Sequence, residues 1–321
     1  MPLVRCSRNP ILTRKDIPDV PPRVVDATSV FNPGAAKHAG SYVLLLRVQT
    51  RGRETFLMVA RGADGERFAV EPRIVELRGV ERVRERVYHV YDPRVTPLDG
   101  AWIVTVAMDT DGGCRSGIAR TRDFATFEFL GVAGDADVRN VVVFPERVGG
   151  RYLRLARPNT VSAAGAAPTG DTVVLEESGD LVTWRAAGEV MRGRLHYWDE
   201  LIGPGAPPVK TRDGWLLVYH GVATHLSTAH IYQAGVALLD LRDPGRVLAR
   251  SRNNVLEPRE PYEHVGQVPN VVFPTGLVVD DADADGFARP ESRALLYYGA
   301  ADLCVGLATA TVGELVAACH D

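Results

Sequence analysis

The 321-residue sequence has only four cysteines, and no two of them form a CxxC pair. Thiols scattered in this way indicate neither a disulfide framework nor a zinc site, and we expect reduced cysteines in a cytoplasmic protein. Apolar runs long enough to span a membrane are absent. The first eighteen residues also lack the apolar core of a secretory signal, which fits the same expectation.

An excess of positive charge is missing as well. The 37 Lys and Arg residues are outnumbered by 40 Asp and Glu residues, which gives a formal net charge of -3. Proteins that bind nucleic acid neutralise its phosphates with a basic surface. We therefore expect no nucleic acid and no membrane among the partners of this protein.

The common catalytic motifs are absent too. The sequence has no GxSxG, Walker, HExxH or GxGxxG motif, so nothing in it indicates a serine hydrolase, a zinc protease or a nucleotide-binding protein. The stretch DADADG (281–286) resembles the start of an EF-hand loop. Its twelfth position is Ser292 instead of Glu, so we interpret it as a surface insertion and predict neither a metal nor an organic cofactor.

What the sequence does contain is a repeated strand pattern. Short apolar runs rich in β-branched and aromatic residues occur at 41–48, 101–108, 151–158, 214–221 and 293–300. Each is followed by a second strand-like run, often with a DF.TF or DL.TW ending, which predicts hairpins. Only TVGELVAACH near the end has a helical pattern.

Five such units predict an all-β fold, a five-bladed β-propeller. We expect one catalytic domain over residues 1–321, with residues 1–25 as an N-terminal extension. A pair of β-sandwiches is the structural alternative.

A polar or proline-containing step precedes each first run. The steps are FNPGAA (31–36), YDPRVTP (91–97), VRNVVVFPE (138–146), LIGPGAPPVKT (201–211) and QVPNVVFPTG (267–276). Taken alone, an Asn or Asp in such a step is an ordinary turn former. In a propeller, however, the innermost strands surround a central funnel, so equivalent steps can gather their polar side chains at one mouth.

Several cations accompany these steps. Arg47 and Arg61 stand in otherwise apolar strands, where an arginine is costly unless an anion or hydroxyl group meets it. Together with Arg139, Lys210 and His220, they would suit a phosphate or carboxylate ligand. Internal salt bridges with nearby Asp and Glu are an equal alternative.

Taken together, nine segments resemble glycoside hydrolase family 130, the β-mannoside phosphorylases, which include mannosylglucose and β-mannooligosaccharide phosphorylases. The segments are FNPGAA, LRVQTRGRETFLMVARG, YDPRVTPLDG, the run from GIARTRDFATFEFLG to RNVVVFPE (117–146), GRYLRLARPN, GWLLVYHGV, YQAGVALLDLRDPGRVL, VPNVVFPTG and YYGAAD. The resemblance implies a five-bladed propeller and a glycosyltransferase-type reaction of carbohydrate metabolism. Inorganic phosphate, as co-substrate, would cleave a β-linked mannoside with inversion and give α-mannose 1-phosphate.

The resemblance also implies residue roles. Asp92 would be the proton donor, acting through the mannose 3-hydroxyl. Phosphate would be held by Arg139, Asn140, Lys210, His220 and Tyr232. Substrate contacts would come from Asn32, Arg47 and Asp302, to which the strand context adds Arg61. His225 and His230, in the loop before Tyr232, are weaker candidates.

Two other functions remain open at this point. A hydrolase of the same family would need a carboxylate that activates water. Asp109 and Asp111 fit a hairpin turn better than this role, and Glu263 is the nearest candidate by context, although we interpret it as a sugar or structural contact. A non-catalytic carbohydrate-binding propeller would have no use for a phosphate set. The linkage, the acceptor sugar and a possible homo-oligomer depend on features that the sequence does not fix.

Overall fold

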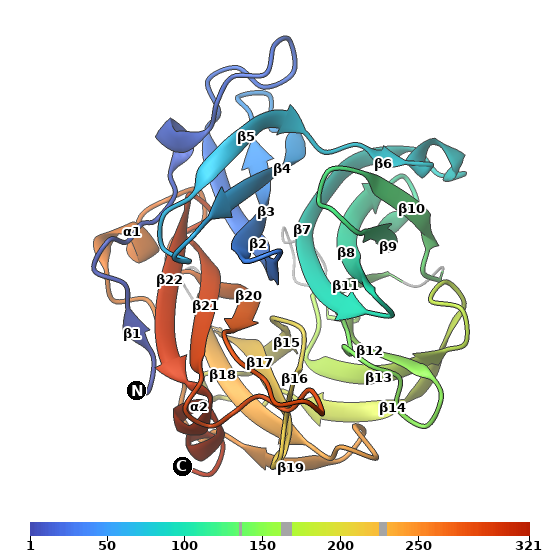
Figure 1. Cartoon of the computed structure of the whole chain (residues 1–321), viewed down its shortest axis with the longest axis vertical. Helices are drawn as coiled ribbons and strands as arrows, with labels where there is room; N and C mark the ends of the chain where they lie inside the picture. The colour runs from blue at the N-terminus through green and yellow to red at the C-terminus, as the bar shows by residue number, and fades with distance from the viewer. Residues whose placement is uncertain (135–136, 162–168, 225–229) are drawn as a thin grey trace.

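The computed structural model of the chain describes residues 1–134, 137–161, 169–224 and 230–321. Its strands form five largely antiparallel sheets arranged around a central axis (Figure 1). The five-bladed β-propeller predicted from the sequence is therefore confirmed. Within the described ranges no helix is long and apolar enough to cross a membrane.

Each blade has its innermost strand near the axis and its later strands progressively further out. Blade 1 consists of β2 (Ser29–His38), β3 (Ser41–Gln49), β4 (Thr55–Gly62) and β5 (Ala69–Ile74). Blade 2 consists of β7 (Val87–Leu98), β8 (Ala101–Thr110), β9 (Gly113–Thr121), β10 (Phe127–Val132) and β6 (Leu77–Arg78). Blade 3 consists of β11 (Val138–Val143), β12 (Tyr152–Pro158), β13 (Thr172–Ser178) and β14 (Trp184–Arg192). Blade 4 consists of β15 (Leu201–Pro204), β17 (Gly214–Ala223), β18 (Ile231–Leu239) and β19 (Val247–Arg250), with β16 (Val209–Thr211) also paired to β17. Blade 5 consists of β20 (Val272–Val279), β21 (Arg293–Ala300), β22 (Cys304–Thr311) and β1 (Val4–Arg5). Helices α1 (Pro261–His264) and α2 (Val312–Ala318) are short.

The five apolar runs predicted as strands become the second strand of each blade: β3, β8, β12, β17 and β21. The predicted helical tail forms α2, whose first turn is capped by Thr311. Blades 1 to 4 also share a turn between their third and fourth strands. In each of these turns an aspartate side chain accepts hydrogen bonds from two following backbone N–H groups, which is a stable local turn: Asp64, Asp123, Asp180 and Asp240.

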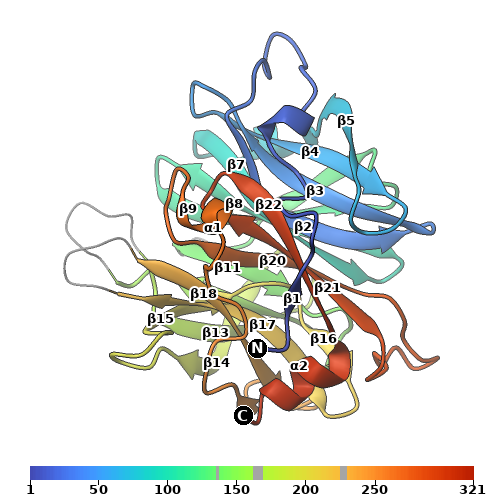
Figure 2. The same cartoon turned by 90° about the vertical axis from the view of Figure 1, so that its left-hand side faces the viewer.

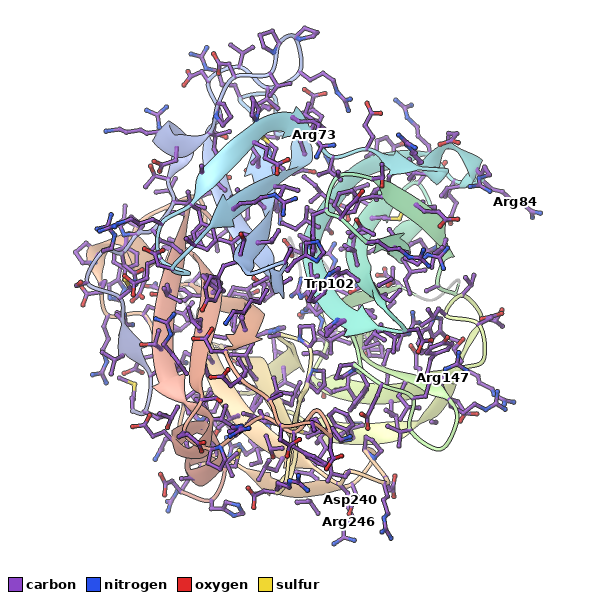
Figure 3. All side chains as sticks on the ribbon, viewed as in Figure 1. Arg73, Arg84, Trp102, Arg147, Asp240 and Arg246 are labelled. Carbon is purple, nitrogen blue, oxygen red and sulfur yellow. The ribbon has the colours of Figure 1, made fainter. Side chains whose placement is uncertain are left out.

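Apolar side chains fill the spaces between neighbouring blades. One cluster joins blades 1 and 2 through residues such as Leu45 and Val104, and another joins blades 5 and 1 through Tyr297 and Leu44. Charged side chains such as Arg84 and those of the Asp240–Arg246 pair project from the outer edges instead (Figure 3). The apolar side chains whose burial stabilises the fold therefore lie between neighbouring sheets.

Blade 5 closes the ring with both ends of the chain, and the two termini lie near each other beside it (Figure 2). Strand β1 pairs with β22 through Val4 opposite Thr309 and Arg5 opposite Ala308. Residues 1–25, which we expected to be an N-terminal extension, thus include a strand of the last blade.

Candidate functional site

Three innermost strands carry the same type of β-bulge. In β2, Phe31 pairs with Arg47 and Gly34 with Leu45, so that two residues lie opposite one. The registers of β7 and β11 shift in the same way after Tyr91 and after Arg139. A bulge of this kind turns a side chain out of the regular alternation of a strand.

The residue at each bulge has a left-handed backbone conformation. The φ angles are 48° at Asn32, 50° at Asp92 and 56° at Asn140. Asn and Asp tolerate this conformation better than other residues with a side chain. The polar residues of these three steps are therefore the ones that the bulge geometry favours.

Asp92 is the centre of one half of the site. Asn32 Nδ2 and Arg47 Nη1 each donate a hydrogen bond of 2.9 Å to Asp92 Oδ1. Burial raises the pKa of Asp92, but the positive charges of Arg47 and Arg94 and the hydrogen bonds from Asn32 and Arg47 outweigh it, so that the pKa lies below its ordinary value. The carboxylate is therefore ionised at neutral pH, with Oδ1 occupied by protein donors.

Asp302, in the turn after β21, faces the same region. Burial and the negative charge of Asp92 raise the pKa of Asp302 to about 6, and the positive charge of Arg47 opposes the rise. Its backbone is also left-handed, with a φ of 49°. The structure thus places Asp302 beside the Asp92–Arg47 pair, where it was expected among the substrate contacts.

Tyr91 joins this half of the site to a second, cationic half. Its ring lies 4.6 Å from the guanidinium carbon of Arg47 and 6.0 Å from that of Arg139. Its hydroxyl donates to Asp109 Oδ1 at 2.7 Å, and the same carboxylate oxygen lies 3.5 Å from an Arg139 nitrogen. Asp109 therefore supports Tyr91 and Arg139 at the end of β8, whereas Asp111 lies in the β8–β9 hairpin turn.

Arg157 is a functional candidate that our sequence analysis missed. It lies opposite Arg139 in the β11–β12 pairing and is buried. Burial lowers the pKa of Arg157 to about 10, and Arg139 contributes to the fall while Tyr232 opposes it. Among the described residues, no carboxylate lies within ion-pair distance of Arg157 or of the equally buried Arg94. The signal for Arg157 was available, because RYLRLARP is an apolar strand interrupted by arginine.

His220, on β17, lies beside Arg157 across Gly203. A methyl group added at Gly203 would stand 2.5 Å from His220 Cε1 and 3.1 Å from Arg157 Cδ. Both ring nitrogens of His220 are buried without a hydrogen-bond partner in the described part of the chain. Burial and the charges of Arg157 and Arg94 hold the pKa of His220 well below its ordinary value, so the ring is neutral and offers one donor and one acceptor.

Tyr232, at the start of β18, completes the cationic half. Its ring stacks on that of His220 with 6.2 Å between the ring centres. Burial raises the pKa of Tyr232, against the positive charge of Arg157, so its hydroxyl stays protonated and able to donate. His230 directly precedes β18, and His225 lies outside the described residues.

Two predicted residues do not join the site. Arg61 pairs with Val43 near the other end of blade 1, and its guanidinium binds Glu71 at 2.7 Å and the backbone of Asp123. The interpretation of Arg61 as a substrate contact therefore does not fit the structure. The salt-bridge alternative applies to this residue.

Lys210 is the second. It lies opposite Trp215, five residues along β17 from His220, which corresponds to roughly 17 Å of strand. Its ammonium group binds Glu146 at 2.8 Å and the backbone of Asp285, and it lies over the Phe287 ring. Lys210 therefore lies too far from the other candidates to bind the same phosphate. The proline-rich segment 201–211 continues well past the mouth of the funnel before the chain comes to Lys210.

Glu263 has a structural position. It is fully buried and accepts hydrogen bonds from Arg5, from the Tyr298 hydroxyl, and from the backbone of Arg259 and Glu260. These donors saturate its oxygens. Our sequence interpretation of Glu263 as a contact instead of a water-activating base agrees with this geometry.

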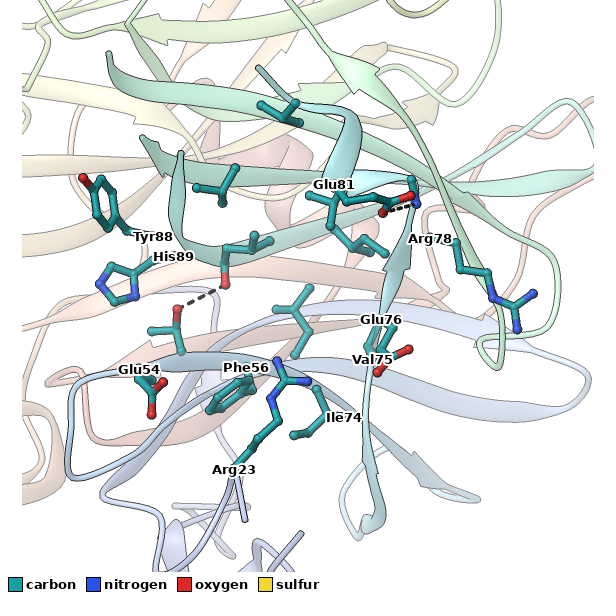
Figure 4. A pocket seen from close by; sticks show the side chains of 18 of the residues that line it. Arg23, Glu54, Phe56, Ile74, Val75, Glu76, Arg78, Glu81, Tyr88 and His89 are labelled. Carbon is teal, nitrogen blue, oxygen red and sulfur yellow. Dashed lines mark hydrogen bonds between the residues drawn. The ribbon is translucent and has the colours of Figure 1, made fainter. Parts of the chain in front are cut away.

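Other regions offer less chemistry. In the DADADG insertion, Asp283 binds Arg212 and the backbone N–H groups of Asp285 and Phe287. No group of three His, Cys, Asp or Glu side chains that could hold a metal occurs within the described ranges. A cavity of about 830 Å³ lies between blades 1 and 2, where Glu81 accepts a hydrogen bond from the backbone of its own turn (Figure 4). It lies outside the Asp92 cluster.

The arrangement combines two carboxyl groups, those of Asp92 and Asp302, with a set of cations and neutral donors. Asp92, Asn32, Arg47 and Asp302 offer hydrogen-bonding groups suited to sugar hydroxyls. Arg139, Asn140, Arg157, His220 and Tyr232 are suited to an oxyanion, since guanidinium, amide and hydroxyl groups all donate to one. The two sets meet at Tyr91, so a sugar and an oxyanion could bind in contact with each other.

Comparison with known proteins agrees with this geometry. Residues 5–321 match a family model described as beta-1,4-mannooligosaccharide phosphorylase. The chain is 32% identical to the Beta-1,4-mannooligosaccharide phosphorylase of Ruminococcus albus over 97% of its own length and 89% of that protein's. It is 30% identical to the 1,2-beta-oligomannan phosphorylase of Thermoanaerobacter sp. over 73% of its length and 68% of that protein's.

Among solved structures, the beta-1,2-mannobiose phosphorylase from Listeria innocua in complex with beta-1,2-mannobiose superimposes with a TM-score of 0.84. The match covers 99% of both chains at 24% sequence identity, which supports the shared propeller fold. The family model also spans almost the whole sequence, and the relative from Ruminococcus albus is more than 30% identical to it. The chain belongs to glycoside hydrolase family 130.

Proposed function

We propose that this protein is an enzyme that catalyses inverting phosphorolysis of a β-linked mannoside with inorganic phosphate. The products are α-D-mannose 1-phosphate and a sugar shortened by one unit. The observation that carries the proposal is a buried arginine, Arg157, which has no carboxylate partner among the described residues and lies beside Arg139, His220 and Tyr232 in the site that also holds Asp92. A buried cation is costly unless an anion compensates it, and phosphate is an anion that is also the nucleophile.

In this mechanism phosphate binds to Arg139, Asn140, Arg157, His220 and Tyr232. These donors orient one phosphate oxygen toward the anomeric carbon, on the face opposite the leaving sugar. Catalysis then depends on positioning and on electrostatic stabilisation. No general base is needed, because phosphate is already ionised, and no cofactor takes part.

Asp92 supplies a proton to the leaving sugar, along the path through the mannose 3-hydroxyl that the family resemblance implies. In the free site the pKa of Asp92 is lowered by Arg47 and Arg94. A bound phosphate offsets this positive charge, and a bound sugar removes water, so both raise the pKa and favour the protonated acid. The proton that HPO₄²⁻ loses when it becomes the sugar phosphate dianion balances the proton that the leaving sugar gains.

The test is to incubate the purified protein with β-1,4-mannobiose and with β-1,2-mannobiose, each with and without phosphate. We expect mannose 1-phosphate from one of them only when phosphate is present. Asp92→Asn should lower kcat by about 10³-fold, because general acid catalysis contributes on that order, while Tm is kept, since Asn fits the left-handed backbone at this position. Full activity of Asp92→Asn would exclude Asp92 as the acid.

A hydrolase is the second candidate. The observation that favours it is Asp302, a second carboxyl group whose pKa is raised to about 6 by burial and by the nearby charge of Asp92. Release of free mannose at the same rate with and without phosphate would establish hydrolysis. It would also show that the cationic half of the site has another role.

A further inference from the structure

We propose that Arg94 is a positioning residue that fixes the backbone of Asp92 and turns the side-chain amide of Asn140 so that its N–H groups face the phosphate. The inference rests on the proposed function and adds a role for a residue that touches neither substrate. It begins from the place of Arg94 at the centre of the propeller, where its side chain is almost completely buried.

Arg94 connects the blades around the axis through its three guanidinium nitrogens. Nη1 donates to the backbone carbonyl of Asp92 at 2.7 Å, and Nε donates to the carbonyl of Gly205, after β15, at 3.0 Å. Nη2 donates to Asn140 Oδ1 at 3.4 Å. The guanidinium carbon also lies 5.5 Å from the centre of the Phe273 ring on β20. One side chain thus contacts blades 2, 3, 4 and 5.

The first consequence concerns Asp92. Its left-handed conformation occurs at a bulge, where the regular ladder hydrogen bonds between β7 and β8 are interrupted. The bond from Arg94 Nη1 satisfies the carbonyl that the bulge turns away from the ladder. It therefore holds the peptide from which the catalytic carboxylate extends.

The second consequence concerns Asn140. A guanidinium group can only donate hydrogen bonds, so the amide atom that faces Arg94 must be the oxygen. The Asn140 nitrogen, on the other branch of the amide, is then left free to donate to phosphate. Without Arg94 the amide could rotate by half a turn and present an acceptor to phosphate, which would repel it.

The acceptors of Arg94 are two carbonyls and an amide oxygen, all uncharged. Lysine keeps the positive charge at this position but cannot donate in three fixed directions. Arg94→Lys therefore separates the effect of charge from that of geometry. We expect this variant to raise the KM for phosphate and to lower kcat, together reducing kcat/KM by roughly 10²-fold, as misplacement by about 1 Å does in other enzymes.

The matched control is Arg154→Lys. Arg154 is as buried as Arg94, and it binds Glu176 and the backbone of Ala133 and lies over the Trp184 ring, away from the site. This variant should lower Tm while kcat and the KM for phosphate stay within about twofold of wild type. A general loss of packing would give both variants the same kinetic effect.

Two further variants test the amide without depending on the folding of Arg94→Lys. In Asn140→Asp, Arg94 holds one carboxylate oxygen and the other faces phosphate, so binding should be about tenfold weaker than in Asn140→Ala. In the double variant Arg94→Lys/Asn140→Ala, the KM for phosphate should be no higher than in Asn140→Ala alone, because the two residues act through one contact. Equal phosphate affinity of Asn140→Asp and Asn140→Ala would overturn the proposal, as would multiplying effects in the double variant.

Phosphate binding is also measured by titration calorimetry in an Asp92→Asn background, where turnover is not required. We expect Arg94→Lys and Asn140→Asp to weaken phosphate binding at least tenfold in that background. Unchanged binding would defeat the role of Arg94 even if the wild type is a phosphorylase. If the wild type forms no product from phosphate while the two variants still bind phosphate more weakly, the proposed function is wrong and the positioning role of Arg94 remains.

Discussion

At the residue scale, Asp302 shows how a binding group can reduce stability. Burial raises the pKa of Asp302 to about 6, above its ordinary value of 3.8. The folded protein therefore favours the protonated form, and stability is lost as the pH rises from about 4 through 6. The ionised carboxylate is tolerated at neutral pH beside Arg47, where it could accept a hydrogen bond from a sugar hydroxyl.

We predict that Asp302→Asn stabilises the protein above pH 6, by on the order of 2 kcal/mol, and has no effect below pH 4. Urea unfolding at pH 4, 5, 6 and 8 measures the difference, and kcat should fall because a sugar contact is changed. Asp123→Asn is the control of opposite sign, because backbone hydrogen bonds lower the pKa of Asp123 to about 2. That variant should be less stable than wild type above pH 4. A gain for Asp302→Asn that is equal at all pH values would contradict the charge argument.

Residue-scale reasoning from the sequence found part of the site. Asn32, Asp92 and Asn140 were found because their polar steps lie in innermost strands, and the bulges that direct them favour Asn and Asp. Arg61 and Lys210 were misplaced because a cation in or near an apolar strand does not reveal which end of that strand it occupies. Only the register shows that Arg61 binds Glu71, and that Lys210 lies beyond the mouth of the funnel.

At the scale of the element, β15 shows why the fourth blade differs from the others. Gly203 on this strand faces His220 and Arg157, and the absence of a side chain lets both approach the axis. The sequence predicted the strands and their grouping into blades, because short apolar runs rich in β-branched and aromatic residues recur along the chain. It could not predict this close approach, which depends on how blades 3 and 4 pack against each other.

We predict that Gly203→Ala raises the KM for phosphate about tenfold and leaves the KM for the mannoside within twofold. The added methyl group would stand 2.5 Å from His220 Cε1, so the ring or the Arg157 stem must move. A shift of this size at the phosphate ligands weakens their common alignment. Initial rates with phosphate and mannoside varied in turn measure the two constants. Gly52→Ala is the matched control, since its nearest neighbour to the added methyl is 3.8 Å away.

At the scale of the whole molecule, the N-terminal segment is held in the last blade by the two paired residues of β1, by a bridge between Leu12 and Val305, and by the ion pair between Arg5 and Glu263. Burial raises the pKa of Glu263, but the hydrogen bond from Arg5 and those from the backbone of Arg259 and Glu260 outweigh it and lower the pKa. This contribution to stability is present above the ordinary pKa of the carboxyl group and is lost as the pH falls below it. Closure should therefore be stronger at neutral than at acidic pH.

Arg5→Met tests this closure because it leaves the Glu263 carboxylate fully buried without its cation. We expect a loss of about 3 kcal/mol at pH 7, as for other buried pairs that lose one partner, and a smaller loss at pH 4, where Glu263 can take up a proton. Thermal unfolding at both pH values measures it. The control is Arg14→Met, whose pair with Asp26 is exposed and should contribute less than about 1 kcal/mol. Equal losses in the two variants at pH 7 would mean that closure depends on the strand pairing and apolar contacts of blade 5. A larger loss for Arg5→Met that shrinks toward pH 4 would identify the buried ion pair as the link that holds the N-terminal strand in the last blade.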